Sequence, residues 1–120
     1  MTQKRILVVE DEALIVMMLE DILGELGYAV SSTAQSVDEA MAALAGGAFD
    51  AVILDVNLGE ERSWPVATLL MERGIPFVLS TGASMNDTPG QFAGVPRVRK
   101  PYTFEDLQST LGALFGEAAS

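Results

Sequence analysis

The sequence predicts an α/β fold in which a parallel five-stranded sheet is covered by helices on both faces. Short apolar runs alternate with segments of helical periodicity, and Gly- or Pro-containing turns separate them. The run Ala51–Leu54 is apolar at every position, as expected for a strand with helices on both sides of its sheet. Right-handed crossovers then give a doubly wound three-layer (βα)5 sandwich.

The first half of the chain begins with the β-rich run Ile6–Val9 and continues with the more polar run Ala29–Thr33, which we place nearer a sheet edge. Between them, apolar residues recur at helical spacing and Gly27 follows as a stop signal. The apolar residues are Ile15, Met18, Leu19, Ile22 and Leu26. A second helix is predicted from the S-x-x-E capping pattern at Ser36 to Gly46-Gly47.

A central strand, a loop and a third helix follow. The strand is Ala51–Leu54, and a loop through Asn57 and Gly59 leads out of it. Pro65 suits the first turn of a helix that runs to about Arg73, because proline lacks only a hydrogen-bond donor that the first turn does not use.

The last third of the chain has a weaker helical signal. Strands are predicted at Pro76–Ser80 and Val95–Arg99. The residues at 82–94 between them include three glycines and one proline, so the fourth helix should be short or irregular, near Pro89–Ala93. Thr103 caps a final helix, whose apolar stripe is Phe104, Leu107, Leu111, Leu114 and Phe115.

The composition narrows the range of functions. With 120 residues, we expect positions 1–120 to form a single domain. The chain has no cysteine and no histidine, which excludes a disulfide framework, a thiol nucleophile, histidine metal sites and a phosphohistidine carrier. A net charge of −10 argues against nucleic acid and anionic membranes as partners, and favours a divalent cation or a basic protein surface. No apolar run is long enough to span a membrane, and we expect a cytoplasmic protein.

Chemically useful side chains follow four of the five predicted strands: Glu10, Asp11 and Glu12, then Asp55, then Ser80 and Thr81, then Lys100. Parallel strands of such a sheet present their carboxyl ends at one edge, where ligands bind. Each group alone has an ordinary explanation, such as a helix cap or a turn. Their conjunction in this strand order favours a functional site.

Three carboxylates at one edge repel one another unless a cation lies among them. Oxygen ligands without histidine or cysteine suit Mg²⁺. Lys100 adds a positive charge and Thr81 a hydroxyl donor, so the set fits a phosphoryl group that is attacked by a carboxylate. Asp55 is the best nucleophile because it ends the most apolar strand, which leaves Glu10 and Asp11 to hold the metal.

The chain resembles the receiver domains of response regulators. The resemblance rests on ILVVEDE (Ile6–Glu12), DAVILDVNLG (Asp50–Gly59), the STG around Thr81 and RKP (Arg99–Pro101). It implies strand order 2-1-3-4-5. By position, the resemblance makes Asp55 the phosphoacceptor, Asp11 and Glu10 acidic metal ligands, Asn57 a ligand through its backbone carbonyl, Thr81 the switch hydroxyl and Lys100 the invariant lysine.

The function implied is that of a phosphorelay switch. A histidine kinase or a phosphohistidine carrier would donate the phosphoryl group to Asp55 with Mg²⁺ as cofactor, and the chain would catalyse only its own transfer and dephosphorylation. Output would be through a downstream protein partner, with the chain a monomer or a phosphorylation-dependent dimer, or the chain would act as a phosphate sink. The alternative is a receiver-fold module that binds partners without phosphorylation. A phosphatase is disfavoured because Asn57 stands where a general acid is needed.

Two features depart from the common receiver pattern. Arg97 occupies the position, three residues before the lysine, where receivers often carry an aromatic switch residue. Only 18 residues (82–99) separate Thr81 from Lys100. Both features, with the string PFVLSTG (Pro76–Gly82), are similar to an alphaproteobacterial subgroup with a PFxFATG[G/Y] motif, which is associated with stress signalling. The motif match is partial.

Overall fold

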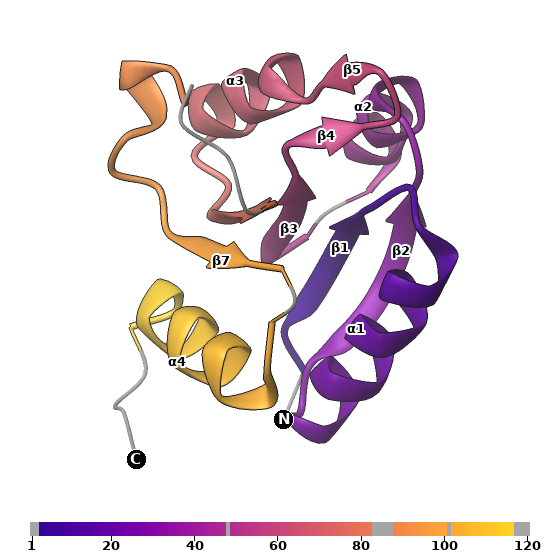
Figure 1. The fold of residues 1–120 in the computed structure, drawn as a ribbon, viewed down its shortest axis with the longest axis vertical. Coiled ribbons are helices and arrows are strands. Elements are labelled where there is room, and N and C mark those ends of the chain that lie inside the picture. The colour runs from indigo at the N-terminus through magenta and orange to yellow at the C-terminus, as the bar shows by residue number, and fades with distance from the viewer. Residues whose placement is uncertain (1–2, 48, 83–87, 101, 117–120) are drawn as a thin grey trace.

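The computed structural model describes the chain except for residues 1–2, 48, 83–87, 101 and 117–120. Its main feature is a parallel five-stranded sheet with the order β2-β1-β3-β6-β7 (Figure 1). The strands are β1 (Arg5–Val9), β2 (Ala29–Ala34), β3 (Ala51–Asp55), β6 (Phe77–Thr81) and β7 (Arg97–Arg99). Because β6 and β7 are the fourth and fifth strands of this sheet, the predicted order 2-1-3-4-5 is confirmed, and β2 lies at an edge as expected.

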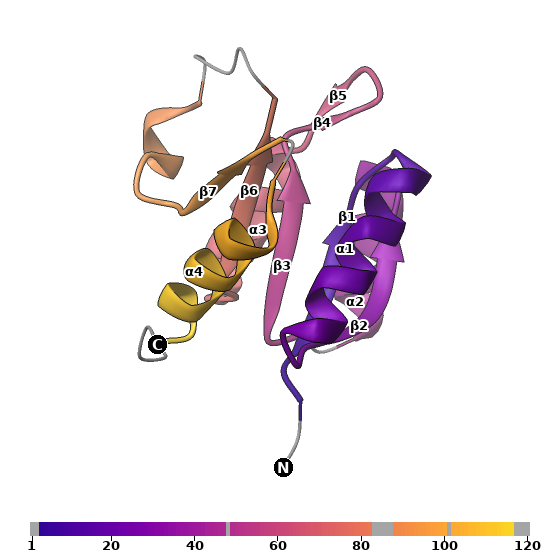
Figure 2. The same ribbon diagram turned by 60° about the horizontal axis from the view of Figure 1, so that its bottom comes forward.

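Four α-helices form the outer layers: α1 (Ala13–Glu25), α2 (Val37–Gly46), α3 (Trp64–Arg73) and α4 (Phe104–Leu114). Helices α1 and α4 cover one face of the sheet, and α2 and α3 cover the other (Figure 2). Alternate residues of each strand enter opposite layers, as the period of two requires. Ile6 and Val8 pack under α1 and α4, whereas Leu7 and Val9 pack under α2 and α3.

Helix caps largely follow the sequence signals. Ser36 Oγ accepts a hydrogen bond from Glu39 N at 3.1 Å, but the Glu39 carboxylate accepts from Gln35 N, one residue before the position that a full capping box uses. Thr103 and Asp106 make the reciprocal pair of bonds at the start of α4. The caps therefore fix where two helices begin, in agreement with the sequence.

A small hairpin replaces the loop expected after β3. Its antiparallel strands are β4 (Asn57–Leu58) and β5 (Glu61–Arg62), and Gly59 opens the turn with φ +62°. Glycine at the first central position of a two-residue turn tolerates this backbone conformation, which side chains disfavour. The hairpin rises at the carboxyl edge of the sheet and leads into α3 (Figure 1).

Between β6 and β7, where the (βα)5 pattern would have another helix, the described residues form no α-helix, in line with the weak helical signal there. A single 3-10 turn, η1 (Gly90–Phe92), takes its place. Phe92 is fully buried and stacks on Trp64, with ring centroids 5.3 Å apart and planes at 14°. Strand β7 is two residues shorter at its start than predicted. No helix in the described part of the chain is long and apolar enough to cross a membrane.

Candidate functional site

Three carboxylates converge at the carboxyl edge of the sheet. Glu10 follows β1, Asp11 follows it, and Asp55 ends β3. One carboxylate oxygen from each lies within 4.8 Å of the others. Glu10 and Asp55 are buried and Asp11 is exposed, so the cluster opens to solvent on the Asp11 side. The parallel sheet thus brings together the three predicted acids.

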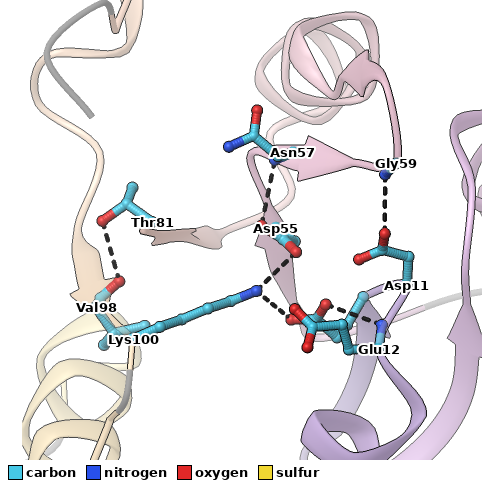
Figure 3. A network of polar contacts seen from close by, with 9 residues as sticks. Asp11, Glu12, Asp55, Asn57, Gly59, Thr81, Val98 and Lys100 are labelled. Atoms are coloured by element: carbon cyan, nitrogen blue, oxygen red, sulfur yellow. Dashed lines mark hydrogen bonds and ion pairs between the residues drawn. The ribbon is translucent and has the colours of Figure 1, made fainter. Parts of the chain in front are cut away.

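Lys100 enters the cluster from the opposite side, just beyond β7 (Figure 3). Its Nζ lies 2.7 Å from Glu10 Oε1 and 2.9 Å from Asp55 Oδ2. The backbone fixes the start of this side chain, because Lys100 N donates to the Thr81 carbonyl at 2.9 Å and continues the β6–β7 pairing. One ammonium therefore bridges two buried carboxylates.

Backbone amides hold each carboxylate in place (Figure 3). Asp55 Oδ1 accepts from Asn57 N at 3.2 Å, and Glu10 Oε2 accepts from Glu12 N at 3.1 Å. Asp11 Oδ2 accepts from Gly59 N, at the hairpin turn, at 2.9 Å. Amide donors stabilise the ionised carboxylates without adding charge, so they position the acids. The second oxygens of Asp55 and Glu10 contact the Lys100 ammonium, and the Asp11 carboxylate lies on the exposed side of the cluster.

Burial and crowding shift the protonation equilibria of the site. Burial raises the pKa of Glu10 to about 7; the Lys100 ammonium partly opposes the rise and Asp55 adds to it. Burial alone would lower the pKa of Lys100, but its two carboxylate partners outweigh that effect and raise it, so the ammonium stays charged. The charged state of the site is therefore costly for Glu10 and favourable for Lys100.

Thr81 is buried at the end of β6, beside the site. Its hydroxyl donates to the Val98 carbonyl at 3.4 Å and is directed toward β7, away from the carboxylates (Figure 3). The structure thus brings together Glu10, Asp11, Asp55 and Lys100, and places Thr81 nearby with its hydroxyl engaged elsewhere. Asn57 lies directly over the site on β4, where its amide contacts Asp55.

The donor set fits a hard divalent cation. Its three carboxylates offer only oxygen ligands, and two of them, Glu10 and Asp55, share the single positive charge of Lys100. The Asp11 side is exposed, which leaves room for water ligands. Asp11, Asp55 and the Asn57 carbonyl are the groups that would hold Mg²⁺, with Glu10 behind them. Burial is the main cause of the raised pKa of Glu10, and a cation among these acids would offset the smaller part that comes from the Asp55 carboxylate.

Sequence reasoning missed two contributors to the site. The Gly59 amide binds Asp11 only because the hairpin folds back over the sheet edge, which the loop prediction did not include. Tyr102, two residues beyond Lys100, is buried, and this burial raises its pKa to about 12. A glycine at a two-residue turn was a usable signal for the first; nothing in the periodicity marked the second.

Comparisons with known proteins agree with this geometry. Residues 6–111 match the model of the response regulator receiver domain. The chain is 35% identical over 115 residues to the transcriptional regulatory protein TcrA of Mycobacterium tuberculosis. The match covers 92% of this chain but only 45% of TcrA. The chain therefore spans less than half the length of that relative.

Solved structures extend the likeness over nearly the whole chain. SdrG from Sphingomonas melonis Fr1 is 44% identical, with a TM-score of 0.85 over 96% of this chain and 99% of that one. The receiver domain of PhyR from Erythrobacter litoralis, 22% identical, has the same fold with a TM-score of 0.79 over 98% of this chain and 94% of that one. The acidic cluster, its lysine, the strand order and these matches have one common explanation: the chain belongs to the receiver domains of two-component response regulators.

Proposed function

We propose that the chain is a phosphorylation switch that accepts a phosphoryl group on Asp55, with Mg²⁺ as cofactor, from a histidine kinase or a phosphohistidine carrier. One observation carries the proposal: Asp55 Oδ2 lies 2.9 Å from the Lys100 ammonium, inside a cluster of three carboxylates. A phosphoryl acceptor requires both a nucleophilic oxygen and nearby positive charge. A buried aspartate with a purely structural role does not require two further carboxylates beside it.

The proposed reaction transfers a phosphoryl group from the nitrogen of the donor to a carboxylate oxygen of Asp55. An Asp55 carboxylate oxygen attacks phosphorus, the bond from phosphorus to the donor nitrogen breaks, and an acyl phosphate forms on Asp55. Water later attacks the same phosphorus and returns the free carboxylate and inorganic phosphate. Mg²⁺, when bound, neutralises the phosphoryl oxygens.

The residues of the chain provide the remaining steps. Asn57 N orients the Asp55 carboxylate, and Lys100 supplies the second positive charge toward the transferred group. The Thr81 hydroxyl, bonded to Val98 only at 3.4 Å, is available to turn toward the phosphoryl group. Apart from this self-catalysed transfer and the hydrolysis of the acyl phosphate, we propose no enzymatic activity.

Output is proposed to pass through protein contact with a downstream partner, or the chain serves as a phosphate sink, as a monomer or a phosphorylation-dependent dimer. The exchange is proposed to take place in the cytoplasm. A BeF3-activated conformation of SdrG has been solved, and that chain is 45% identical to this one, with 95% of this chain and 98% of that chain covered. This supports the proposal that Asp55 can be phosphorylated. Pro76, Phe77, Thr81 and Gly82 of the subgroup motif support a place in stress signalling.

The test is the intact mass of the protein after incubation with acetyl phosphate, and separately with a phosphohistidine protein, each with Mg²⁺. Wild type should gain the mass of one phosphoryl group, and Asp55→Asn should gain none. Asp21→Asn, on the exposed surface of α1, is the matched control and should behave as wild type. If folded wild-type protein gains no mass from either donor, the switch is refuted in favour of a receiver-fold module that binds without phosphorylation.

A further inference from the structure

Two hydroxyl groups are buried beside the charged site with no role in the chemistry above. Tyr102 is 4% exposed and Ser80 is 1% exposed. Neither hydroxyl oxygen makes a well-aligned hydrogen bond within the described part of the chain. Burying an unsatisfied hydroxyl is unfavourable, and phenylalanine and alanine would fill the same space without that cost. Their presence next to an active cluster therefore calls for an explanation.

Strand register places both hydroxyls on the face of the sheet that carries the acids. Ser80 of β6 is the direct register partner of Asp55 of β3. Glu10 continues the alternation of Ile6 and Val8, which pack under α1 and α4. Tyr102 belongs to that same buried layer. Ser80 and Tyr102 thus lie on the same face of the sheet as Glu10 and Asp55, in the buried layer under α1 and α4.

Glu10 is one of three charged groups of the site that act on the Tyr102 hydroxyl. Burial raises the pKa of Tyr102, the nearby Ser80 hydroxyl lowers it, and Glu10 affects it more than Lys100 or Asp55 does. Glu10 Oε1 contacts the Lys100 ammonium at 2.7 Å but makes no well-aligned hydrogen bond of its own. Two buried hydroxyls without a well-aligned partner therefore lie on the same face of the sheet as the Glu10 carboxylate, whose Oε1 has the Lys100 ammonium as its contact.

We propose that Tyr102 and Ser80 form a hydroxyl pair that supplies a replacement hydrogen-bond donor to the Glu10 carboxylate when the Lys100 ammonium moves away from it. Both are positioning residues in this proposal, because they act through Glu10. The event that moves Lys100 rests on the proposed function: a phosphoryl group on Asp55 carries more negative charge than the free carboxylate and draws the ammonium toward itself. The hydroxyl pair itself does not depend on that event.

Such a replacement has a clear physical benefit. Without Lys100, the Glu10 carboxylate is buried beside Asp55 with only the Glu12 amide as a donor. A hydroxyl that donates to a carboxylate makes a charge-assisted bond, which is stronger than one between neutral groups. The pair would hold the Glu10 side chain in place behind the metal ligands while Lys100 is engaged with the phosphoryl group.

The first test needs no phosphoryl donor. Tyr102→Phe and Ser80→Ala are introduced into wild type and into Lys100→Met, and urea unfolding is followed by circular dichroism in an osmolyte that keeps Lys100→Met folded. In wild type, Tyr102→Phe should leave the unfolding equilibrium constant unchanged or lower it, because the substitution removes a buried hydroxyl that has no well-aligned partner. In Lys100→Met at alkaline pH, where Glu10 is ionised, it should raise that constant by about five-fold or more, because the carboxylate then loses the tyrosine donor as well as the ammonium. Tyr28→Phe, in the contact with Phe115 remote from the site, should show no such coupling to Lys100.

The second test measures phosphorylation by acetyl phosphate as a function of Mg²⁺ concentration. Tyr102→Phe should lower the rate at saturating Mg²⁺ by about five-fold while the Mg²⁺ concentration for half-saturation stays within about two-fold of wild type. A general loosening of the site would change both quantities. Tyr28→Phe should match wild type in both.

The outcomes separate this inference from the proposed function. If wild type takes no phosphoryl group, the proposed function fails and the unfolding cycle alone decides the hydroxyl pair. If wild type is phosphorylated but Tyr102→Phe is additive with Lys100→Met and reacts at the wild-type rate, the hydroxyl pair is overturned and the proposed function stands.

Discussion

Replacing Lys100 with methionine should destabilise the protein strongly, and in a pH-dependent way. The substitution keeps most of the apolar stem and removes the ammonium. Two carboxylates then remain buried without their shared countercharge, since the Glu10 and Asp55 side chains are only 2% and 5% exposed. Breaking a buried ion pair by removing one partner costs about 3–5 kcal/mol. That is a large part of the ~5–15 kcal/mol total stability of a typical domain.

The sign of the pH dependence follows from Glu10. Its pKa in the folded state is about 7, above the value of 4.5 in an unfolded chain, and Lys100 is the group that restrains the rise. Without Lys100 the folded pKa moves higher still. A folded state that holds its proton more tightly loses stability as the pH rises through the interval between the two pKa values. The loss in Lys100→Met should therefore be largest at alkaline pH and smaller below about pH 5.

Urea unfolding followed by circular dichroism at about pH 5 and about pH 8 measures this, with and without Mg²⁺. Added Mg²⁺ should recover part of the loss at the higher pH by replacing the missing positive charge. Lys4→Met, at the other lysine, is the matched control. Lys4 lies over the Phe115 ring at 5.2 Å, and its loss should cost about 1 kcal/mol or less at both pH values. A loss in Lys100→Met that is equal at both pH values, or no larger than the control, would refute the reasoning.

Three further predictions concern the fold. Leu70→Ala, at a fully buried position of α3, should lower the free energy of unfolding by about 2–5 kcal/mol in urea titrations. Thr103→Ala removes the reciprocal cap of α4 and should cost about 1 kcal/mol in the same assay, whereas Gln108→Ala on the exposed side of that helix should cost little. The pKa of Tyr102 is raised to about 12 from 10.0, so the folded state binds this proton more tightly than the unfolded state, and the free energy of unfolding should fall as the pH rises through that interval. Tyr102→Phe should remove this pH dependence of the free energy of unfolding. An unchanged pH dependence would contradict the raised pKa of Tyr102.

Much of the fold was predictable because hydrophobic periodicity records burial directly. Ala51–Leu54 reads as a fully buried strand and is one, extended by Asp55. Thr103 and Ser36 mark helix starts because their hydroxyls satisfy amides that are otherwise free. Pro96 shows the limit of this approach. The apolar pattern predicts a strand from Val95 that includes Pro96, but proline has no N–H to donate to a ladder, and β7 begins only after it.

The acids and the lysine of the site were also predictable, because parallel strands share one carboxyl edge. What holds them was not. The hydrogen bond from Gly59 N to Asp11 depends on a hairpin whose turn brings a backbone amide over the sheet edge. Every residue except proline has a backbone N–H, so the residue type does not indicate which amide makes this contact. The burial of Tyr102 follows from the path of the chain between β7 and α4, which no local pattern encodes.

The stack of Trp64 on Phe92 has a practical consequence. Trp64 is the single tryptophan of the chain, and indole emission responds to the packing and polarity around the ring. The stack ties α3, which follows the hairpin over the site, to the 3-10 turn that stands where a helix was expected. The molecule therefore carries an intrinsic fluorophore at the junction of these two segments. A change in the position of either one, with metal or phosphoryl occupancy, can be followed in solution without attaching a label.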